Sequence, residues 1–260
     1  MALTSIEKYY NKFNEDKRLK TRHGQVEFLT TTKYILKYIS KNKNAKVLDI
    51  GAGTGAYSKF LKENGFDVTA VELVAKNLSV LKQNVPNIPA YLGNALNLKR
   101  FKDNTFDFVL LLGPMYHLFT EQDKLKALNE AKRVVKPNGL IFVAYCLNEY
   151  AVISYAFKEN NYSQVLLNNK LTKDFKVISN QDDLYSYDNL KIINNLKKQA
   201  NLKRVKIFSP DGPTDYMRQT INKMDEQTFL GYINFVQKNC ERKDLLGAGS
   251  HIVDILKKID

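Results

Sequence analysis

Cysteine is scarce in this 260-residue sequence, and its two cysteines, Cys146 and Cys240, make neither a disulfide framework nor a metal-ligand pair. The sequence also lacks a run of about 18 apolar residues, which excludes a membrane-spanning helix. Its first residues lack the apolar core of a signal peptide. We therefore expect a cytoplasmic protein without a bound metal, long enough to bury a core that needs no disulfides.

Arginine is scarce too, although the chain is strongly basic. Lysine and arginine number 40 against 27 acidic residues, which gives a formal net charge of +13. Only seven of the 40 are arginines, and the lysines are scattered beside many asparagines. Proteins that read nucleic acids favour arginine because its guanidinium group offers a planar fork of donors. The excess charge is better explained by an AT-rich coding composition, and a nucleic-acid partner is possible but not favoured.

Segments with the hydrophobic periods of strands and helices alternate from residue 45 onward. The expected strands are 45–50, 67–72, 90–92, 106–112, 140–145, 204–208 and 251–256. The expected helices between them are 57–64, 75–84, 124–135, 188–200 and 217–239. Such alternation predicts an α/β protein with a parallel sheet and right-handed crossovers.

Two segments do not follow this alternation. Residues 4–40 show two helical patterns separated by a polar stretch at 14–24. Residues 147–187 are rich in Asn, Tyr, Phe and Lys without a clear period, and we interpret them as an insertion, helical in part, over the carboxyl edge of the sheet. The expected division is an N-terminal helical lid at 1–44, a core at 45–145 and 188–260, and an inserted cap at 146–187.

Glycines follow the first expected strand, at Gly51, Gly53 and Gly55. Glycine lets the backbone turn sharply and lets a ligand approach where a Cβ atom would collide. In a doubly wound sheet such a turn lies where the strand order reverses, and ligands bind there. Glu72 ends the next strand, 21 residues after Gly51, where a carboxylate can accept hydrogen bonds from ribose hydroxyls. The spacing also fits a dinucleotide, so these residues alone leave two ligand classes open.

In successive places the sequence resembles the class I S-adenosylmethionine-dependent methyltransferases. Residues 49–55, Asp-Ile-Gly-Ala-Gly-Thr-Gly, resemble their first motif, and Glu72 resembles their ribose-binding acid. Residues 93–95, Gly-Asn-Ala, resemble the segment along the adenine, although the family usually has Asp where Asn stands here. Residues 106–113 resemble the fourth strand, and residues 136–139 resemble the turn before the fifth.

The resemblance implies a Rossmann-like seven-stranded sheet, mostly parallel with an antiparallel last strand, behind N-terminal helices that cover the cofactor. It covers about residues 45–145. Residues 113–118 and 240–245 also resemble a group of bacterial methyltransferases of unassigned substrate. The resemblance implies that the chain binds S-adenosylmethionine and releases S-adenosylhomocysteine. Arg22, Tyr9 and Tyr10 would reach the methionine carboxylate if the first helices close as a lid. The other residues that it assigns to the cofactor are Asp49, Gly51, Ala52, Gly53, Thr54, Glu72, Leu73, Asn94, Ala95 and Leu111.

Methyl transfer from a sulfonium is an in-line displacement, for which positioning and desolvation supply much of the rate. A general base is needed only if the acceptor is protonated. We expect Tyr116 and His117, just after the fourth strand, to face the methyl group. His117 is the candidate base because the ordinary histidine pKa is about 6.5. Gly113 stands where nucleic-acid amino methyltransferases carry Asp or Asn, which disfavours that class.

Aromatic residues of the expected cap indicate a pocket for a small, partly apolar acceptor, although they could equally serve to pack the cap. They are Tyr150, Tyr155, Phe157, Tyr162, Phe175, Tyr185 and Tyr187. The sequence therefore predicts a methyltransferase with a small-molecule acceptor. An RNA or protein methyltransferase that uses the basic surface, an NAD-linked oxidoreductase and a non-catalytic cofactor-binding module are the alternatives. No feature predicts the methylated atom or an oligomeric state.

Overall fold

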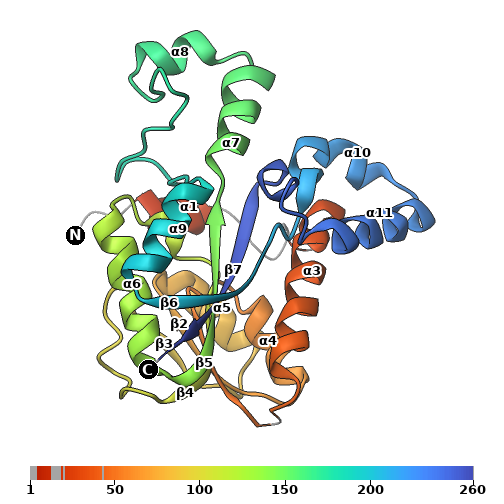
Figure 1. Ribbon diagram of the computed structural model, residues 1–260. Coiled ribbons are helices and arrows are strands. Elements are labelled where there is room, and N and C mark those ends of the chain that lie inside the picture. The colour runs from red at the N-terminus through yellow and green to blue at the C-terminus, as the bar shows by residue number, and fades with distance from the viewer. Residues whose placement is uncertain (1–4, 13–18, 20, 43, 260) are drawn as a thin grey trace.

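A computed structural model describes residues 5–12, 19, 21–42 and 44–259 (Figure 1), so the expectations for residues 1–4, 13–18, 20 and 43 fall outside the described part of the chain. The described residues form one seven-stranded sheet in the order β3-β2-β1-β4-β5-β7-β6. In chain order the strands are β1 Lys46–Ile50, β2 Asp67–Glu72, β3 Ala90–Leu92, β4 Phe106–Leu111, β5 Val135–Cys146, β6 Leu202–Phe208 and β7 His251–Lys258.

All strand pairs from β3 to β5 are parallel, whereas β7 runs antiparallel to both β5 and β6. This arrangement confirms the predicted fold class. The chain runs from β1 outward to β2 and β3 and then returns to β4 on the other side of β1. The loops after β1 and β4 therefore leave the sheet in opposite directions and open a crevice at its carboxyl edge, where ligands bind in such sheets.

Helices cover both faces of the sheet (Figure 1). The α-helices are α1 Ser5–Lys12, α3 Arg22–Ile39, α4 Ala56–Glu63, α5 Ala75–Asn84, α6 Glu121–Val134, α7 Asn148–Ala151, α8 Tyr162–Leu167, α9 Leu190–Gln199, α10 Arg218–Lys223 and α11 Glu226–Asn239. The 3₁₀ segments are η1 Met115–His117, η3 Gly212–Met217 and η4 Leu246–Ala248, and η2 Val152–Lys158 is a π-helix. Of the helices in the described ranges, none has the length and hydropathy needed to cross a bilayer.

The core has two halves because alternate residues of a strand point to opposite faces. Leu48 and Ile50 of β1 pack with α6 and α9 on one face. Val47 packs with α3, α4 and α5 on the other face, where Ile35 and Leu61 are fully buried. Apolar burial contributes about 25 cal/mol per Å², so these two clusters hold the strand ends, and with them the crevice, in fixed positions.

Two elements differ most from the sequence expectations. Strand β5 starts at Val135, and residues 136–139, expected as a turn before the strand, form a bulge within it, where Asn138 has a φ of 65°. The helix expected at 217–239 is broken, because the Asp225 side chain accepts a hydrogen bond from the Thr228 amide at 2.8 Å and so starts a new helix.

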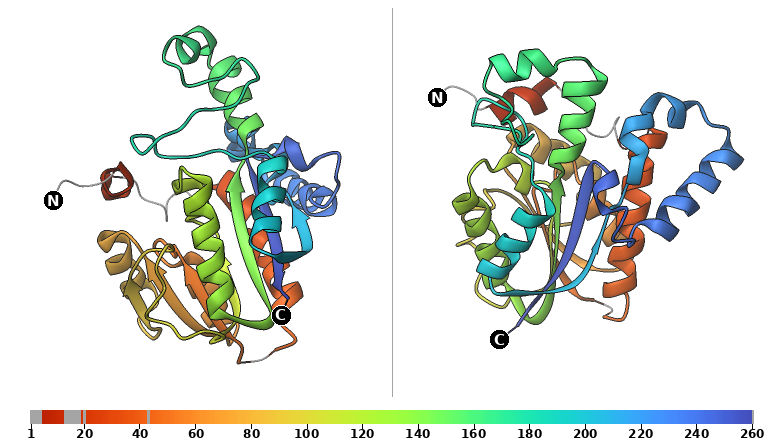
Figure 2. Two further views of the ribbon diagram at one scale, coloured as in Figure 1. Left: turned by 60° about the vertical axis from the view of Figure 1, so that its left-hand side comes forward. Right: turned by 45° about the horizontal axis from the view of Figure 1, so that its top comes forward.

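Residues 147–187 extend beyond the carboxyl edge of the sheet and carry α7, η2 and α8 (Figure 2). Both ends of this segment are tied to the core. The Leu147 amide donates to the Ser250 carbonyl at 2.9 Å, and the Asp188 amide donates to the Cys146 carbonyl at 2.9 Å. The Asp188 carboxylate also forms a buried ion pair with Lys124 of α6. The segment is therefore held over the crevice from two sides.

Candidate functional site

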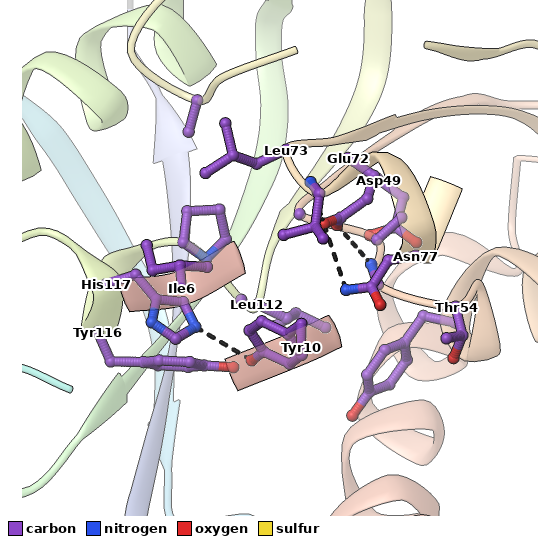
Figure 3. Close-up of a pocket in the computed structure, with 18 of the residues that line it drawn as sticks. Ile6, Tyr10, Asp49, Thr54, Glu72, Leu73, Asn77, Leu112, Tyr116 and His117 are labelled. Atoms are coloured by element: carbon purple, nitrogen blue, oxygen red, sulfur yellow. Dashed lines mark hydrogen bonds between the residues drawn. The ribbon is translucent and has the colours of Figure 1, made fainter. Parts of the chain in front are cut away.

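A cavity of about 390 Å³ lies at the carboxyl edge of the sheet, at the crevice between the loops after β1 and β4 (Figure 3). Its walls come from the loops after β1, β2, β3 and β4 and from helices α1 and α3. Eleven of the thirteen residues predicted for the site line it: Asp49, Gly51, Ala52, Gly53, Thr54, Glu72, Leu73, Asn94, Ala95, Tyr116 and His117.

The glycine turn after β1 is held by backbone contacts and leaves one side open. The amides of Gly51 and Ala52 donate to the Val71 carbonyl of β2 at 2.8 and 3.1 Å. Gly51 and Gly53 have φ values of 71° and 57°, in the left-handed region that favours glycine. A Cβ atom on Gly51 would lie 2.8 Å from the Pro114 ring, whereas one on Gly53 would meet no atom within 4 Å. Gly53 therefore presents bare backbone to the cavity.

Glu72, at the end of β2, is only 5% exposed but lines the cavity. Its carboxylate accepts hydrogen bonds from the Gly53 and Val74 amides, both at 2.8 Å, and from the Asn77 side chain at 3.5 Å. Burial raises the pKa of Glu72, and the two backbone donors oppose that rise. Because each carboxylate oxygen has two acceptor positions, the group can accept further hydrogen bonds from a ligand.

Asp49 lies beside Glu72 at the end of the neighbouring strand β1. It is 2% exposed, and the Ser58 hydroxyl donates to its carboxylate at 2.7 Å. Burial raises the pKa of Asp49 to about 6, and the charge of Glu72 adds to the rise. Two carboxylates on adjacent strands therefore give the floor of the cavity a negative potential that favours a cationic ligand.

The loops after β2 and β3 supply an apolar wall with a polar edge. Leu73 is 40% exposed and lines the cavity together with Leu112 and the buried Ala95. The Asn94 side-chain oxygen accepts a hydrogen bond from the Leu96 amide at 2.9 Å, which shapes the loop. An apolar slot that ends in an amide side chain suits a flat heterocyclic ring with polar edges.

His117 is held by two hydrogen bonds in η1. Its Nδ1 lies 2.8 Å from the Leu184 carbonyl, and its Nε2 lies 3.1 Å from the Tyr10 hydroxyl. A carbonyl oxygen only accepts, so Nδ1 carries the proton and Nε2 accepts from Tyr10. Burial lowers the pKa of His117 to about 4. The imidazole is therefore neutral at physiological pH, with its lone pair directed at Tyr10.

Tyr116 completes an aromatic wall at the same end of the cavity. Its ring packs edge-on against His117 at 4.9 Å and against Tyr185 of the overlying segment at 5.7 Å. The hydroxyl groups of Tyr10 and Tyr116 point toward each other (Figure 3). The Ser186 amide donates to the Tyr116 carbonyl at 2.7 Å. The segment over the crevice thus contacts the two residues that the sequence assigned to chemistry.

Two residues predicted for the cofactor lie elsewhere. Arg22 is directed at α11: it donates to the Asp225 carbonyl at 3.0 Å, pairs with Glu226 at 3.2 Å and lies over the Phe229 ring at 4.9 Å. Leu111 is fully buried in the core, and the next residue, Leu112, lines the cavity instead. The strand period explains the second difference, because adjacent residues face opposite sides of the sheet.

Other lining residues come from the N-terminal helices, and of these only Tyr10 was singled out by the sequence. Ile6, Glu7 and Tyr10 reach the cavity from α1, and Glu27 reaches it from α3. Residues three and four apart share one face of a helix, so the spacing of the α1 residues is consistent with one face toward the cavity. The amphipathic period of α1 was visible in the sequence, but it gave no information on whether that face meets the core or a ligand.

A second polar cluster was also missed. The sequence indicated no metal-ligand cluster. In the structure the His251 Nδ1 lies 2.7 Å from the Asp211 carboxylate, and ligand atoms of these two residues and Asp215 lie within 4.8 Å of one another. The Ser250 hydroxyl donates to Asp215 at 2.6 Å. These side chains form hydrogen bonds with one another, so we interpret the cluster as a buried structural network.

Comparisons with known proteins agree with this geometry. The methyltransferase domain family matches residues 48–143. An uncharacterized methyltransferase of Mycobacterium bovis is 37% identical over 94 residues, which are 36% of this chain and 37% of that protein. The demethylmenaquinone methyltransferase of Paenarthrobacter aurescens is 34% identical over 137 residues, 53% of this chain and 51% of that protein. The chain thus spans only about a third to a half of the length of these curated relatives.

A solved structure extends the likeness to the whole chain. The S-adenosylmethionine-dependent methyltransferase of Thermotoga maritima superposes with a TM-score of 0.62 over 98% of this chain and 99% of that one, at 18% identity. At this identity the likeness shows a shared fold. In this chain that fold brings the glycine turn and the acid at the end of β2 into the wall of one cavity. Residues 48–143 of this chain are thus a domain of the methyltransferase family, and the described residues share the fold of a solved S-adenosylmethionine-dependent methyltransferase.

Proposed function

We propose that the chain binds S-adenosylmethionine in the cavity and transfers its methyl group to a small-molecule acceptor. One observation carries the proposal: the open glycine turn after β1, the carboxylate at the end of β2 and the apolar slot after β3 line the same cavity. The methyltransferase domain at residues 48–143 supports the reaction, and the likeness to a demethylmenaquinone methyltransferase supports a small-molecule acceptor. When bound, the cofactor supplies an activated methyl group on a sulfonium, so the protein needs no metal for this step.

The residues of the cavity fit this ligand part by part. Glu72 would accept hydrogen bonds from the ribose hydroxyls, because its carboxylate faces the cavity and retains acceptor capacity. Leu73 and Ala95 would flank the adenine, with Asn94 at its polar edge. The bare backbone at Gly53 leaves room for the amino-acid part. Arg22 would first have to leave its contacts with α11 to reach the carboxylate of that part.

We also propose the division into structural parts that the sequence predicts: a lid at 1–44, a core at 45–145 and 188–260, and a cap at 146–187. Tyr10 of the lid bonds to His117, and the cap segment around Tyr185 packs on the same histidine at 5.4 Å. Both pieces therefore meet beside the acceptor end of the cavity, where exclusion of water strengthens electrostatic interactions in the transition state.

His117 remains the candidate base, acting through the Tyr10 hydroxyl that it accepts from. Its lowered pKa also makes stability depend on pH. The unfolded histidine binds a proton below about pH 6.5, whereas the folded one does so only near its pKa of about 4. Stability is therefore lost as the pH falls between these values, by up to about 3 kcal/mol.

We expect His117→Gln to flatten this part of the pH dependence, measured by urea unfolding of both proteins across the acid range. The comparison of the two proteins removes the opposite contribution of Asp49, whose raised pKa favours the folded state on acidification. Parallel curves for the two proteins would show that His117 is not buried in its neutral form. Unchanged turnover of the variant would show that His117 does not act as the general base.

Calorimetry with S-adenosylhomocysteine tests cofactor binding directly, and a tritiated-methyl screen of metabolite and RNA fractions then tests the acceptor class. We expect binding of S-adenosylhomocysteine in the micromolar range, which corresponds to a binding free energy on the order of −8 kcal/mol. We expect the tritium label in the small-molecule fraction. No binding at millimolar S-adenosylhomocysteine would contradict the proposed cofactor. Tritium label in RNA or protein would show that the acceptor is a macromolecule and not a small molecule.

A further inference from the structure

A second cavity of about 390 Å³ lies within residues 146–187, the proposed cap. Its described lining residues all fall between residues 151 and 187, and every residue of that range is in the described part of the chain. Figure 2 shows this segment beyond the carboxyl edge of the sheet. The volume suits a small molecule, since sites for such ligands measure about 300–1,000 Å³. We call this cavity the cap cavity, and we call the one at the crevice the cofactor cavity.

The floor of the cap cavity is apolar. Val152 and Ala156 of η2, Val165 of α8 and the nearby Leu171 line it, and all four are buried. They form one small apolar cluster, separate from the two halves of the sheet core. The π-helix η2, which supplies two of them, is of a rare kind that is found frequently at functional sites. The floor therefore combines apolar contact with a backbone form that often marks a site.

Neutral polar groups and aromatic rings stand around this floor. Tyr155, Tyr185 and Tyr187 line the cap cavity, and aromatic side chains pack favourably against other rings. Gln164 and Asn168 add side-chain amides to the lining. Amide and phenol groups can both donate and accept hydrogen bonds. Such a lining suits a ring compound with hydroxyl or carbonyl substituents.

The charged side chains among the described lining residues, Lys170 and Asp183, bind each other. The Lys170 ammonium donates to the two carboxylate oxygens of Asp183 at 2.9 and 2.7 Å. Asp183 also accepts from the Asn180 amide at 2.8 Å. An ionic ligand would lose hydration against the apolar floor and would have to compete for charged groups that are already bound. The cap cavity therefore favours an uncharged ligand.

The cap cavity adjoins the proposed acceptor end of the cofactor cavity. Leu184 and Tyr185 line the cap cavity, whereas His117 and Tyr116 line the cofactor cavity. The Leu184 carbonyl accepts from the His117 Nδ1 at 2.8 Å. The Tyr185 ring lies 5.4 Å from the His117 ring and 5.7 Å from the Tyr116 ring. A molecule in the cap cavity therefore needs to extend only past Tyr185 to reach the residues expected beside the methyl group.

We propose that the cap cavity binds the methyl acceptor, an uncharged ring compound with hydroxyl or carbonyl substituents, with its reacting end directed past Tyr185 toward the cofactor cavity. This inference rests on the proposed methyltransferase function and deepens it. The apolar floor holds the ring, and the neutral polar groups of the lining bind its substituents. The placement brings the reacting end to His117, the candidate base.

The test compares three probes with one ring system: 1-naphthol, 1-naphthoate and 1-naphthylmethylamine, which are neutral, anionic and cationic at neutral pH. Each is titrated by calorimetry into the full chain saturated with S-adenosylhomocysteine. We expect 1-naphthol to bind at least about tenfold more tightly than either ion, because the ions lose hydration on the apolar floor. Equal binding, a preference for either ion, or no binding of 1-naphthol at millimolar concentration would overturn the proposal.

Nuclear Overhauser effects between 1-naphthol and the methyl groups of the unmodified chain locate the bound probe. We expect contacts of its ring with Val152, Val165 and Leu171, which line the cap cavity. Contacts with Leu112 and Leu118 alone would place the probe in the cofactor cavity and would contradict the proposed site.

Ala156→Leu tests the same location by filling the floor. We expect the variant to bind 1-naphthol at least about tenfold more weakly and S-adenosylhomocysteine as before. Ser163→Leu is the matched control, because it adds the same side chain to an exposed position of α8 that is not among the lining residues. No loss in Ala156→Leu, or an equal loss in both variants, would refute the location. If Ala156→Leu does not fold, the contacts measured on the unmodified chain decide.

Asp183→Asn tests why an uncharged ligand is preferred. The variant removes the carboxylate charge that binds Lys170, so the ammonium becomes available to an anionic ligand. We expect 1-naphthoate to gain at least about tenfold in affinity relative to 1-naphthol, measured by the same calorimetry. An unchanged ratio would show that the Lys170–Asp183 pair does not set the preference.

Failure of this proposal and failure of the proposed function give different results. Loss of S-adenosylhomocysteine binding by the unmodified chain would contradict the methyltransferase function itself. Normal binding of that ligand, with 1-naphthol unbound or bound outside the cap cavity, would contradict only the acceptor site.

Discussion

Replacement of Gly53 by alanine is expected to weaken binding of S-adenosylhomocysteine by about 10- to 100-fold, or about 1.4–2.7 kcal/mol. The added Cβ atom would meet no protein atom within 4 Å, so it would project into the cavity. The left-handed φ of 57° adds a backbone cost of roughly 1–2 kcal/mol to folding. Calorimetry at equal fractions of folded protein separates the two effects.

Gly65→Ala is the matched control for this experiment. Gly65 has a φ of 86° and also meets no atom within 4 Å of its would-be Cβ, but it lies in the turn between α4 and β2 and does not line the cavity. The control should lose a similar amount of stability and keep its affinity for the ligand. Equal loss of affinity in both variants would mean that backbone strain, and not the open face of Gly53, controls binding.

Replacement of Asp211 by alanine is expected to destabilise the fold by about 3–5 kcal/mol, because it leaves the imidazolium of His251 buried without its partner. Asp211 is 2% exposed, and its carboxylate also lies within hydrogen-bond distance of the Ser250 hydroxyl. Urea unfolding measures the change. The pKa of His251, followed by NMR, should fall toward the value that burial alone favours.

Asp244→Ala provides the comparison, since Asp244 pairs with Arg242 at 2.6 Å on the surface, where both side chains are more than half exposed. We expect no measurable change in stability from this exposed pair. A loss of stability in Asp211→Ala no larger than that in Asp244→Ala would show that the buried network does not hold η3 against the start of β7. Retained binding of S-adenosylhomocysteine in the folded fraction would confirm that the network is structural.

The cofactor half of the site was predictable because its signals are local. A glycine turn after an apolar strand, and an acid at the end of the next strand, fall within about 20 residues of each other and depend on strand geometry alone. The parallel pairing of β1 with β2 then places Gly53 against Glu72, at 2.8 Å between the amide nitrogen and the carboxylate. Amphipathic periods likewise indicated the helices that cover the sheet.

Residues whose role depends on packing were not predictable in the same way. Arg22 lies on a helix at the right place in the chain, but the rotation of α3 against α11 directs it away from the cavity. Asp211 and His251 are 40 residues apart, and only the antiparallel pairing of β6 with β7 brings the loops around them together. Sequence periodicity says which residues of an element share a face, but it does not say what that face meets.

The sequence by itself determined the order of strands and helices, the glycine turn and the carboxylate that pairs with it, because each follows from short-range backbone geometry and hydrophobic period. The tertiary structure alone decided which other residues line the cavity. Glu7 and Glu27 reach it from helices that precede the sheet, far in sequence from the glycine turn. Long-range packing therefore completed the site, because side chains distant in sequence converge only when the chain folds.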